Sequence, residues 1–146
     1  MANQDTPIRL ILLQSHVEQG EIISSALRNG GFAVRLNRAN DLEDLAAQLA
    51  SNSTDIVLAA FQHPHCTLEQ VAATMRSVSS DAVLIATHAS VDEDIHAAVY
   101  AHGACQLINL KRPAQALAAT RWAMAHLGEL RSSKRLALAL RESERR

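Results

Sequence analysis

The chain has 146 residues, which is enough for one domain with a single hydrophobic core. Apolar residues make up 48% of the sequence and the formal net charge is -1, which argues against a disordered chain and against a strongly basic nucleic-acid-binding domain. The N-terminus lacks the features of a signal peptide, and no apolar run approaches the roughly 20 residues that a membrane-spanning helix needs. We therefore expect a cytoplasmic protein without membrane contacts, whose two cysteines, Cys66 and Cys105, are reduced.

Five short apolar runs are predicted to form strands, and the amphipathic stretches between them are predicted to form helices. The strand-like runs cover residues 8–13, 32–36, 56–60, 82–86 and 105–108. The segment Asn29-Gly30-Gly31 predicts the end of the first helix. Helix starts are predicted from capping-box spacings and from one proline, namely Ser15 with Glu18, Asn40 with Glu43, Thr67 with Gln70, Ser90 with Glu93, and Pro113. This alternation predicts an α/β protein of the flavodoxin-like, doubly wound class, with a five-stranded parallel sheet in the order 2-1-3-4-5.

The last predicted helix is extended at its C-terminal end, because Gly128 is the only glycine between residues 114 and 146. We therefore divide the chain into an N-terminal tail (1–7), a domain (8–128) and a helical linker towards a further domain (129–146). Leu136 and Leu140 share one face of this linker, but it lacks the sustained apolar seam of a long coiled coil. The alternative is that the segment is a frayed, solvated tail.

The third strand-like run carries the most informative feature of the chain. It reads D-I-V-L-A-A-F-Q-H-P, and the strand closes at Ala60. In this setting the run resembles the third strand of response-regulator receiver (CheY-like) domains, whose last residue is the aspartate that accepts a phosphoryl group. The resemblance also rests on the order of elements, on Pro64 after this strand, on Thr87 at the end of the fourth, and on Gly103-Ala104 before the fifth.

The resemblance implies a receiver whose phosphorylation site is degenerate. Receivers hold Mg²⁺ with an acidic pair beside the acceptor aspartate, and a hydroxyl and a lysine contact the phosphoryl group. The corresponding positions are Gln14 and Ser15 for the acidic pair, Ala60 for the acceptor, Thr87 for the hydroxyl, and Leu110, or Lys111 with one inserted residue, for the lysine. One retained hydroxyl does not support phosphoryl transfer, which needs a metal and positioned charge. We therefore expect a pseudo-receiver that is not phosphorylated by the usual route, is not an enzyme and has no cofactor.

Histidine and cysteine residues gather in the loops that follow the predicted strands, at one edge of the sheet. They are His16, His63, His65, Cys66 and His88. Imidazole and thiolate suit zinc or copper, and histidine titrates near neutral pH, so the alternative function is a metal- or pH-sensing domain. Their spacing matches no known metal motif, and loop histidines of this kind are usually exposed to solvent, so we expect no metal.

The resemblance also implies protein partners. Receivers commonly pair through the face of the fourth helix, fifth strand and fifth helix, and the matching segment contains Tyr100, Trp122, Met124 and Leu127. We therefore expect a homodimer and contacts with other signalling proteins or domains, with Trp122 either an exposed anchor or packed on the sheet. Binding of nucleic acid through the basic residues of the linker is not expected, because acidic residues offset them and aromatic residues are absent there.

The closing residues 140–146 resemble the connector that leads into PAS sensor domains. A degenerate receiver before such a connector is similar to the N-terminus of FimX-type proteins, which carry receiver, PAS, GGDEF and EAL modules, bind cyclic-di-GMP and govern type IV pili and twitching motility. The resemblance implies a regulatory interaction and dimerisation module within a larger cyclic-di-GMP signalling protein of bacteria. The residues that bind nucleotide, or carry cyclase or phosphodiesterase chemistry, would lie in those other modules.

Overall fold

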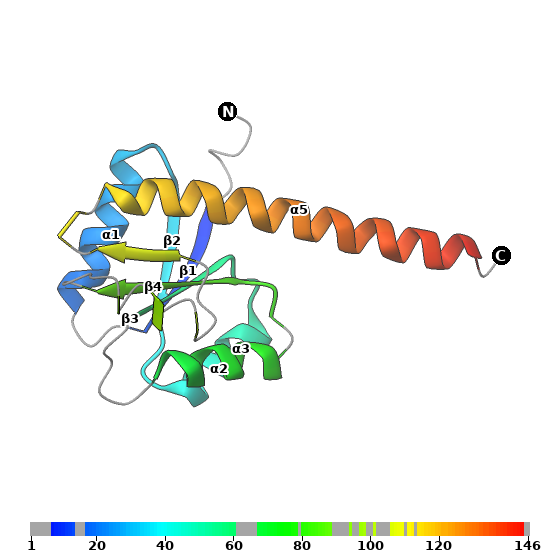
Figure 1. Ribbon diagram of the computed structural model, residues 1–146, viewed down its shortest axis with the longest axis horizontal. Coiled ribbons are helices and arrows are strands. Elements are labelled where there is room, and N and C mark those ends of the chain that lie inside the picture. The colour runs from blue at the N-terminus through cyan, green and yellow to red at the C-terminus, as the bar shows by residue number, and fades with distance from the viewer. Residues whose placement is uncertain are drawn as a thin grey trace.

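The computed structural model describes residues 7–13, 17–60, 67–78, 80–88, 94, 97–98, 101, 106–109, 111–112 and 114–144. The strands are β1 (Ile8–Leu13), β2 (Val34–Arg38), β3 (Ile56–Ala60), β4 (Val83–His88) and β5 (Gln106–Asn109). The helices are α1 (Val17–Asn29), α2 (Leu42–Ser51), α3 (Leu68–Ser77) and α5 (Gln115–Glu144). The strands pair in parallel in the order β2-β1-β3-β4-β5, which confirms the predicted flavodoxin-like sheet (Figure 1).

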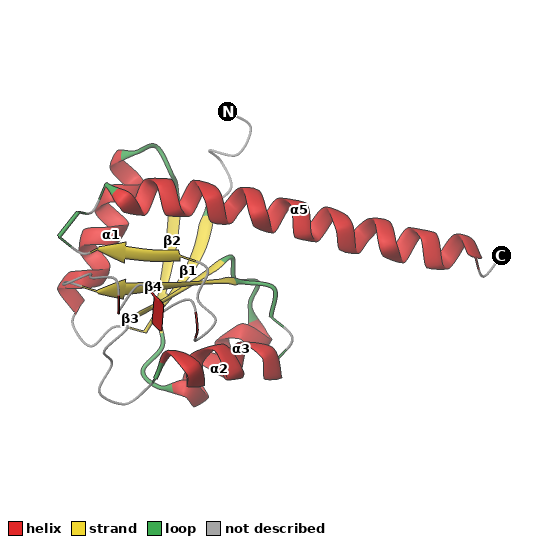
Figure 2. Ribbon diagram, viewed as in Figure 1, coloured by secondary structure: helices red, strands yellow, loops and turns green. Residues whose placement is uncertain are grey.

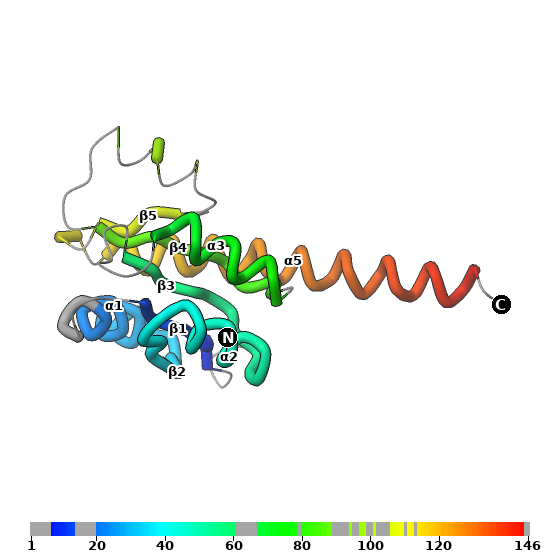
Figure 3. Tube along the Cα trace, turned by 90° about the horizontal axis from the view of Figure 1, so that it is seen from below, coloured from blue at the N-terminus to red at the C-terminus, as the bar shows by residue number. Residues whose placement is uncertain are grey.

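Helices cover both faces of the sheet (Figure 2). Helices α1 and α5 pack on one face and α2 and α3 on the other, as the view from below also shows (Figure 3). Successive residues of β1 therefore enter different clusters: Leu10 and Leu12 pack with α1 and α5, and Ile11 and Leu13 with α2 and α3. A strand that is covered on both faces is mostly apolar, which explains why β3 is a continuous apolar run and why β1 is apolar apart from the exposed Arg9.

Helix α1 ends at the predicted glycine pair. Gly31 has a φ of 98°, in the left-handed region that favours glycine. The Phe32 N–H donates to the Leu27 carbonyl (3.0 Å) and the Gly31 N–H to the Arg28 carbonyl (3.1 Å), which together form a Schellman motif. Because Phe32 takes part in this helix exit, β2 begins only at Val34, two residues later than predicted.

The start of α3 has the predicted capping box. The Gln70 N–H donates to Oγ1 of Thr67 (3.1 Å), and the Thr67 N–H donates to Oε1 of Gln70 (3.0 Å). The prediction for this helix is confirmed. The starts predicted at Ser15, Ser90 and Pro113 lie outside the described residues.

The start of α2 differs from the prediction by one residue. The N-cap is Asp41, whose Oδ1 accepts a hydrogen bond from the Asp44 N–H (2.7 Å). The Asn40 N–H in turn donates to Oδ2 of Asp44 (3.0 Å). The predicted cap, Asn40 with Glu43, is therefore wrong: an aspartate at the next position accepts the same bond, and its charge also interacts favourably with the N-terminus of the helix.

Helix α5 runs unbroken from Gln115 to Glu144. Its first half packs on the sheet through small side chains and one leucine, which are Ala116, Ala119, Thr120, Ala123 and Leu127. Every residue from Ser132 to Glu144 is exposed, and this part, the α5 extension, projects away from the sheet (Figure 1). No helix in the described part of the chain combines the length and the apolar character that a membrane span requires.

Candidate functional site

The carboxyl edge of the sheet brings the ends of three strands together. Ala60 closes β3 and pairs in register with Thr87 of β4, and Thr87 pairs with Ile108 of β5. The Ala60 side chain is 8% exposed and Thr87 is 1% exposed. A methyl group can neither attack a phosphoryl donor nor bind a metal ion, so β3 supplies no nucleophile at its end.

The other residues predicted around this edge are only partly described. Gln14, Ser15 and Leu110 lie outside the described residues. Lys111 is exposed in the turn after β5, where its N–H donates to Oδ1 of Asn109 (2.9 Å). The structure thus places Ala60 and Thr87 side by side and leaves the predicted positions for the acidic pair untested.

The histidine-rich edge is described at one residue, since His88 closes β4 and is half-buried. Among the described residues, no group of three histidine, cysteine, aspartate or glutamate side chains is arranged to hold a metal ion. The remaining predicted candidates, His16, His63, His65 and Cys66, lie outside the described residues.

The predicted contact residues of α5 do not share one environment. Trp122 is 41% exposed and stacks on His126, with ring centroids 5.0 Å apart and planes 8° from parallel. Met124 is half-buried against the core, and Leu127 is 0% exposed within it. A side chain without exposed surface cannot contact a second protein, so the assignment of Leu127 to a contact face is wrong. Tyr100 lies outside the described residues.

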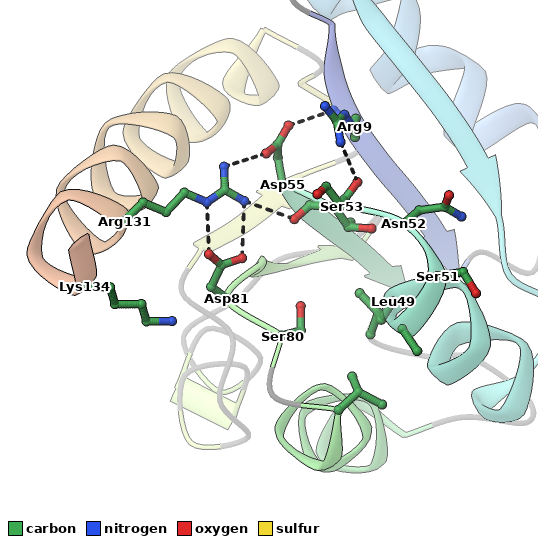
Figure 4. A pocket seen from close by; sticks show the side chains of 13 residues that line it. Arg9, Leu49, Ser51, Asn52, Ser53, Asp55, Ser80, Asp81, Arg131 and Lys134 are labelled. Carbon is green, nitrogen blue, oxygen red and sulfur yellow. Dashed lines mark hydrogen bonds and ion pairs between the residues drawn. The ribbon is translucent and has the colours of Figure 1, made fainter. Parts of the chain in front are cut away.

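A polar cluster at the opposite, amino edge of the sheet was not predicted. Arg131 of α5 reaches two aspartates that each stand just before a strand (Figure 4). Its guanidinium binds Asp81 through two bonds, Nε to Oδ2 (3.0 Å) and Nη2 to Oδ1 (3.2 Å), and it binds Asp55 through Nη1 to Oδ1 (3.0 Å). Nη2 also lies 3.5 Å from the Thr54 carbonyl oxygen. We call Arg131, Asp55 and Asp81 the Arg131 clasp.

The charges of the clasp stabilise one another. The hydrogen bond from Arg131 lowers the pKa of Asp81, against an opposing effect of burial. The same pairing raises the pKa of Arg131, chiefly through its bond to Asp81, so the guanidinium stays charged. Arginine suits this position because its planar fork can bind one carboxylate with two parallel bonds and still reach a second.

A cavity of about 560 Å³ opens beside the clasp, and Arg9, Ser53 and Lys134 line it together with clasp residues (Figure 4). The only sequence signal for this cluster is that Asp55 and Asp81 each precede a strand-like run. Parallel strands begin at the same edge of a sheet, so these two carboxylates had to lie near one another. Nothing local to Arg131 indicates that it is their partner.

The Arg131 clasp should make the free energy of unfolding depend on pH under acidic conditions. The pKa of Asp81 is lowered from its ordinary value of 3.8, so its pairing stabilises the fold above that value and is lost as the pH falls through the lower, folded-state pKa. We expect the difference in unfolding free energy between the wild type and Arg131→Gln to be full at about pH 6 and to shrink below about pH 4. Urea unfolding at a series of pH values measures this difference. A gap of the same size at both ends of the series would contradict the pairing.

The fold is that of several solved response regulators. A putative response regulator from Chloroflexus aurantiacus matches with a TM-score of 0.70 and 17% identity, over 82% of this chain and 99% of that chain. A response regulator from Thermotoga maritima matches with a TM-score of 0.68 and 16% identity, over 82% of this chain and 98% of that chain.

Another solved structure matches a larger share of this chain. A fusion protein that contains a trimeric coiled coil of yeast Spc42 matches over 95% of this chain and 93% of that chain, with a TM-score of 0.68 and 16% identity. No protein-family model and no curated protein matches the sequence. On the evidence of its strand order, its helices and these structures, the chain has the fold of response-regulator receiver domains.

Proposed function

We propose that this chain is a pseudo-receiver: a non-enzymatic regulatory module of bacterial signal transduction that works through protein contacts and self-association instead of phosphorylation. The observation that carries the proposal is Ala60 at the end of β3, where the receiver family has its acceptor aspartate. As a finer part of this proposal, supported by the resemblance to FimX-type proteins, the module belongs to a larger cyclic-di-GMP signalling protein in which the α5 extension leads to the next domain.

The acceptor aspartate is not the only group of the phosphorylation site that this chain lacks. Phosphoryl transfer depends on a metal ion and on positioned charges that neutralise the transferred group. The positions that would supply the metal ligands, Gln14 and Ser15, are neutral in the sequence, and a hard cation such as Mg²⁺ binds carboxylates in preference to them. Thr87 remains, but its hydroxyl is buried beside the methyl group of Ala60 and cannot by itself support the transfer.

Self-association is supported by apolar residues along one side of α5. Leu140 follows Trp122 by 18 residues, which is five turns of an α-helix, and Leu136 and His126 lie close to the same line. We call Trp122, His126, Leu136 and Leu140 the α5 stripe. In the stripe, Trp122, Leu136 and Leu140 are 41%, 63% and 57% exposed, so part of their apolar surface is available to a partner.

The partner that suits the α5 stripe is a second copy of the same helix. A short helix that makes no tertiary contacts is marginal in water, and pairing two such extensions would bury their leucines and stabilise both. One of the solved structures that match, over 95% of this chain, is a fusion protein with a trimeric coiled coil. Glu129 and Ser133 interrupt the stripe, so we expect reversible association that depends on concentration.

The first test uses acetyl phosphate with Mg²⁺ as the phosphodonor. We expect the intact mass of the purified chain to stay unchanged, because β3 ends without a nucleophile. We expect sedimentation to show dimers that form as the concentration rises, with or without the phosphodonor. A stable added phosphoryl group that changes the association state would overturn the proposal.

The second test asks which residues mediate association. Replacing Leu136 and Leu140 together by serine should weaken dimerisation at least about tenfold, which corresponds to about 1.4 kcal/mol. Leu138→Ser is the matched control, because Leu138 is 57% exposed in the same extension but lies on another side of the helix. Equal weakening by the control, or none by the double variant, would show that the α5 stripe is not the contact.

A further inference from the structure

Arg131 lies where α5 leaves the folded body of the protein. Leu127, one turn earlier, is fully buried in the core, and Arg131 itself is partly buried. From Ser132 onwards every described residue of the helix is exposed. Arg131 therefore makes the last hydrogen bonds that join the described part of α5 to the body of the protein, and Lys134, one turn further, lines the same cavity.

The Arg131 clasp connects this part of α5 to three strands of the sheet. Arg131 binds Asp81, just before β4, and Asp55, just before β3. Oδ2 of Asp55 also accepts a hydrogen bond from the Arg9 N–H of β1 (3.0 Å). The backbone of Asp55 is tied to the same strands, because its N–H donates to the Arg9 carbonyl and its carbonyl accepts from the Val83 N–H, both at 3.0 Å.

The hydrogen bonds of Arg131 restrict the rotation of α5 about its axis as well as its distance from the sheet. One hydrogen bond would let the helix turn about the contact, whereas the two bonds to Asp81 and the third to Asp55 fix the plane of the guanidinium. Arg131 follows Leu127 by four residues, so it continues the sheet-facing side of α5 with a polar contact. The side of the helix that carries the α5 stripe is then set relative to the sheet.

We propose that the Arg131 clasp is the joint that fixes the direction and rotation of the α5 extension, and that it passes movements of the segments before β3 and β4 to that extension. The input would thus act at the amino edge of the sheet, opposite the edge that carries Ala60 and Thr87. This proposal rests on the proposed function in treating the extension as the output of the module.

The test measures the distance between spin labels on the extension and on the body. Labels at Ser143→Cys and Ala47→Cys, both exposed positions, would be placed in a chain whose Cys66 and Cys105 are replaced by serine. The labelled chain is diluted with unlabelled chain, so that only distances within one molecule are recorded by pulsed electron resonance. Circular dichroism and urea unfolding of the same samples establish that each variant folds.

We expect a narrow distance distribution in the parent chain and one at least twice as wide in Arg131→Gln. Arg135→Gln is the matched control, because Arg135 is an exposed arginine one turn further along the same helix, and its distribution should remain narrow. Asp81→Asn should widen the distribution as well, and adding it to Arg131→Gln should widen it little further, because the two groups form one interaction.

The milder Asp81→Asn variant decides the matter if Arg131→Gln does not fold. If a folded clasp variant kept a narrow distribution of distances between the labels, the proposal that the clasp is a joint would be wrong. Equal widening in Arg135→Gln would also contradict it. The proposed function has a separate readout, because dimerisation and resistance to acetyl phosphate are measured on the unlabelled chain. A narrow distribution that widens in the clasp variants, in a chain that becomes phosphorylated, would support the joint and contradict the proposed function. A distribution that the clasp variants leave unchanged, in a chain that is not phosphorylated, would contradict the joint alone.

Discussion

Replacing Leu127 by alanine should lower the free energy of unfolding by about 3 kcal/mol, the size found for buried leucines whose removal leaves a cavity. Leu127 is 0% exposed and packs with residues of β1, β3, β4 and α1 in the cluster beneath α5. The variant removes apolar contacts from this cluster, and the neighbouring elements can close the space only partly. Urea unfolding followed by circular dichroism measures the change.

Leu138→Ala provides the control for this prediction. It makes the same chemical change in the same helix, at a residue that is 57% exposed, so we expect a change within about 0.5 kcal/mol. If Leu127→Ala were equally mild, or if it weakened dimerisation without lowering stability, Leu127 would be a contact residue after all. The pair of variants thus separates the core side of α5 from its exposed side.

The central strands could be predicted from the sequence because they are buried on both faces. Such strands are mostly apolar, and Ile56–Ala60 and Ile8–Leu13 were predicted with their observed bounds. The second strand was misplaced because Phe32 and Ala33 are apolar as well, although Phe32 takes part in the exit of α1. Hydrophobicity alone does not distinguish a residue that completes a helix cap from one that starts an edge strand.

The sides of α5 were harder to predict than its existence. The residues at 116, 119, 120, 123 and 127 recur at helical spacing and are buried, so the sequence already contained the core side of the helix. Leu127 was instead grouped with Trp122 because both lie in the segment that matches the pairing face of receivers. The structure separates them, since Trp122 stacks on His126 at the surface and Leu127 lies beneath the helix.

The Arg131 clasp could not be predicted because its partners are distant in sequence. Arg131 stands 50 residues from Asp81 and 76 from Asp55, and ion pairs leave no local periodicity that would announce them. The sequence pattern placed Arg131 in the helical linker predicted over residues 129–146, outside the folded domain. The docking of α5 across the sheet brings Arg131 to the edge at which both aspartates lie.

Restoring an aspartate at the end of β3 should destabilise the protein without restoring phosphorylation. In Ala60→Asp a carboxylate would replace a methyl group that is 8% exposed, beside Thr87, which is 1% exposed. Moving a charge into a position with so little exposure is costly, and we expect a loss of about 3 kcal/mol of unfolding free energy. With acetyl phosphate and Mg²⁺ the intact mass should remain that of the variant.

Ala60→Asn is the control, because asparagine has nearly the size of aspartate but no charge. It should destabilise less than Ala60→Asp near pH 7, and the difference between the two variants should shrink in acid, where the carboxylate is protonated. Phosphorylation of Ala60→Asp would mean that the acceptor alone had been lost and that the remaining site can still hold Mg²⁺. That result would contradict our inference that the neutral residues Gln14 and Ser15 do not support Mg²⁺ binding. The single change at position 60 would then be enough to explain why the protein is not phosphorylated.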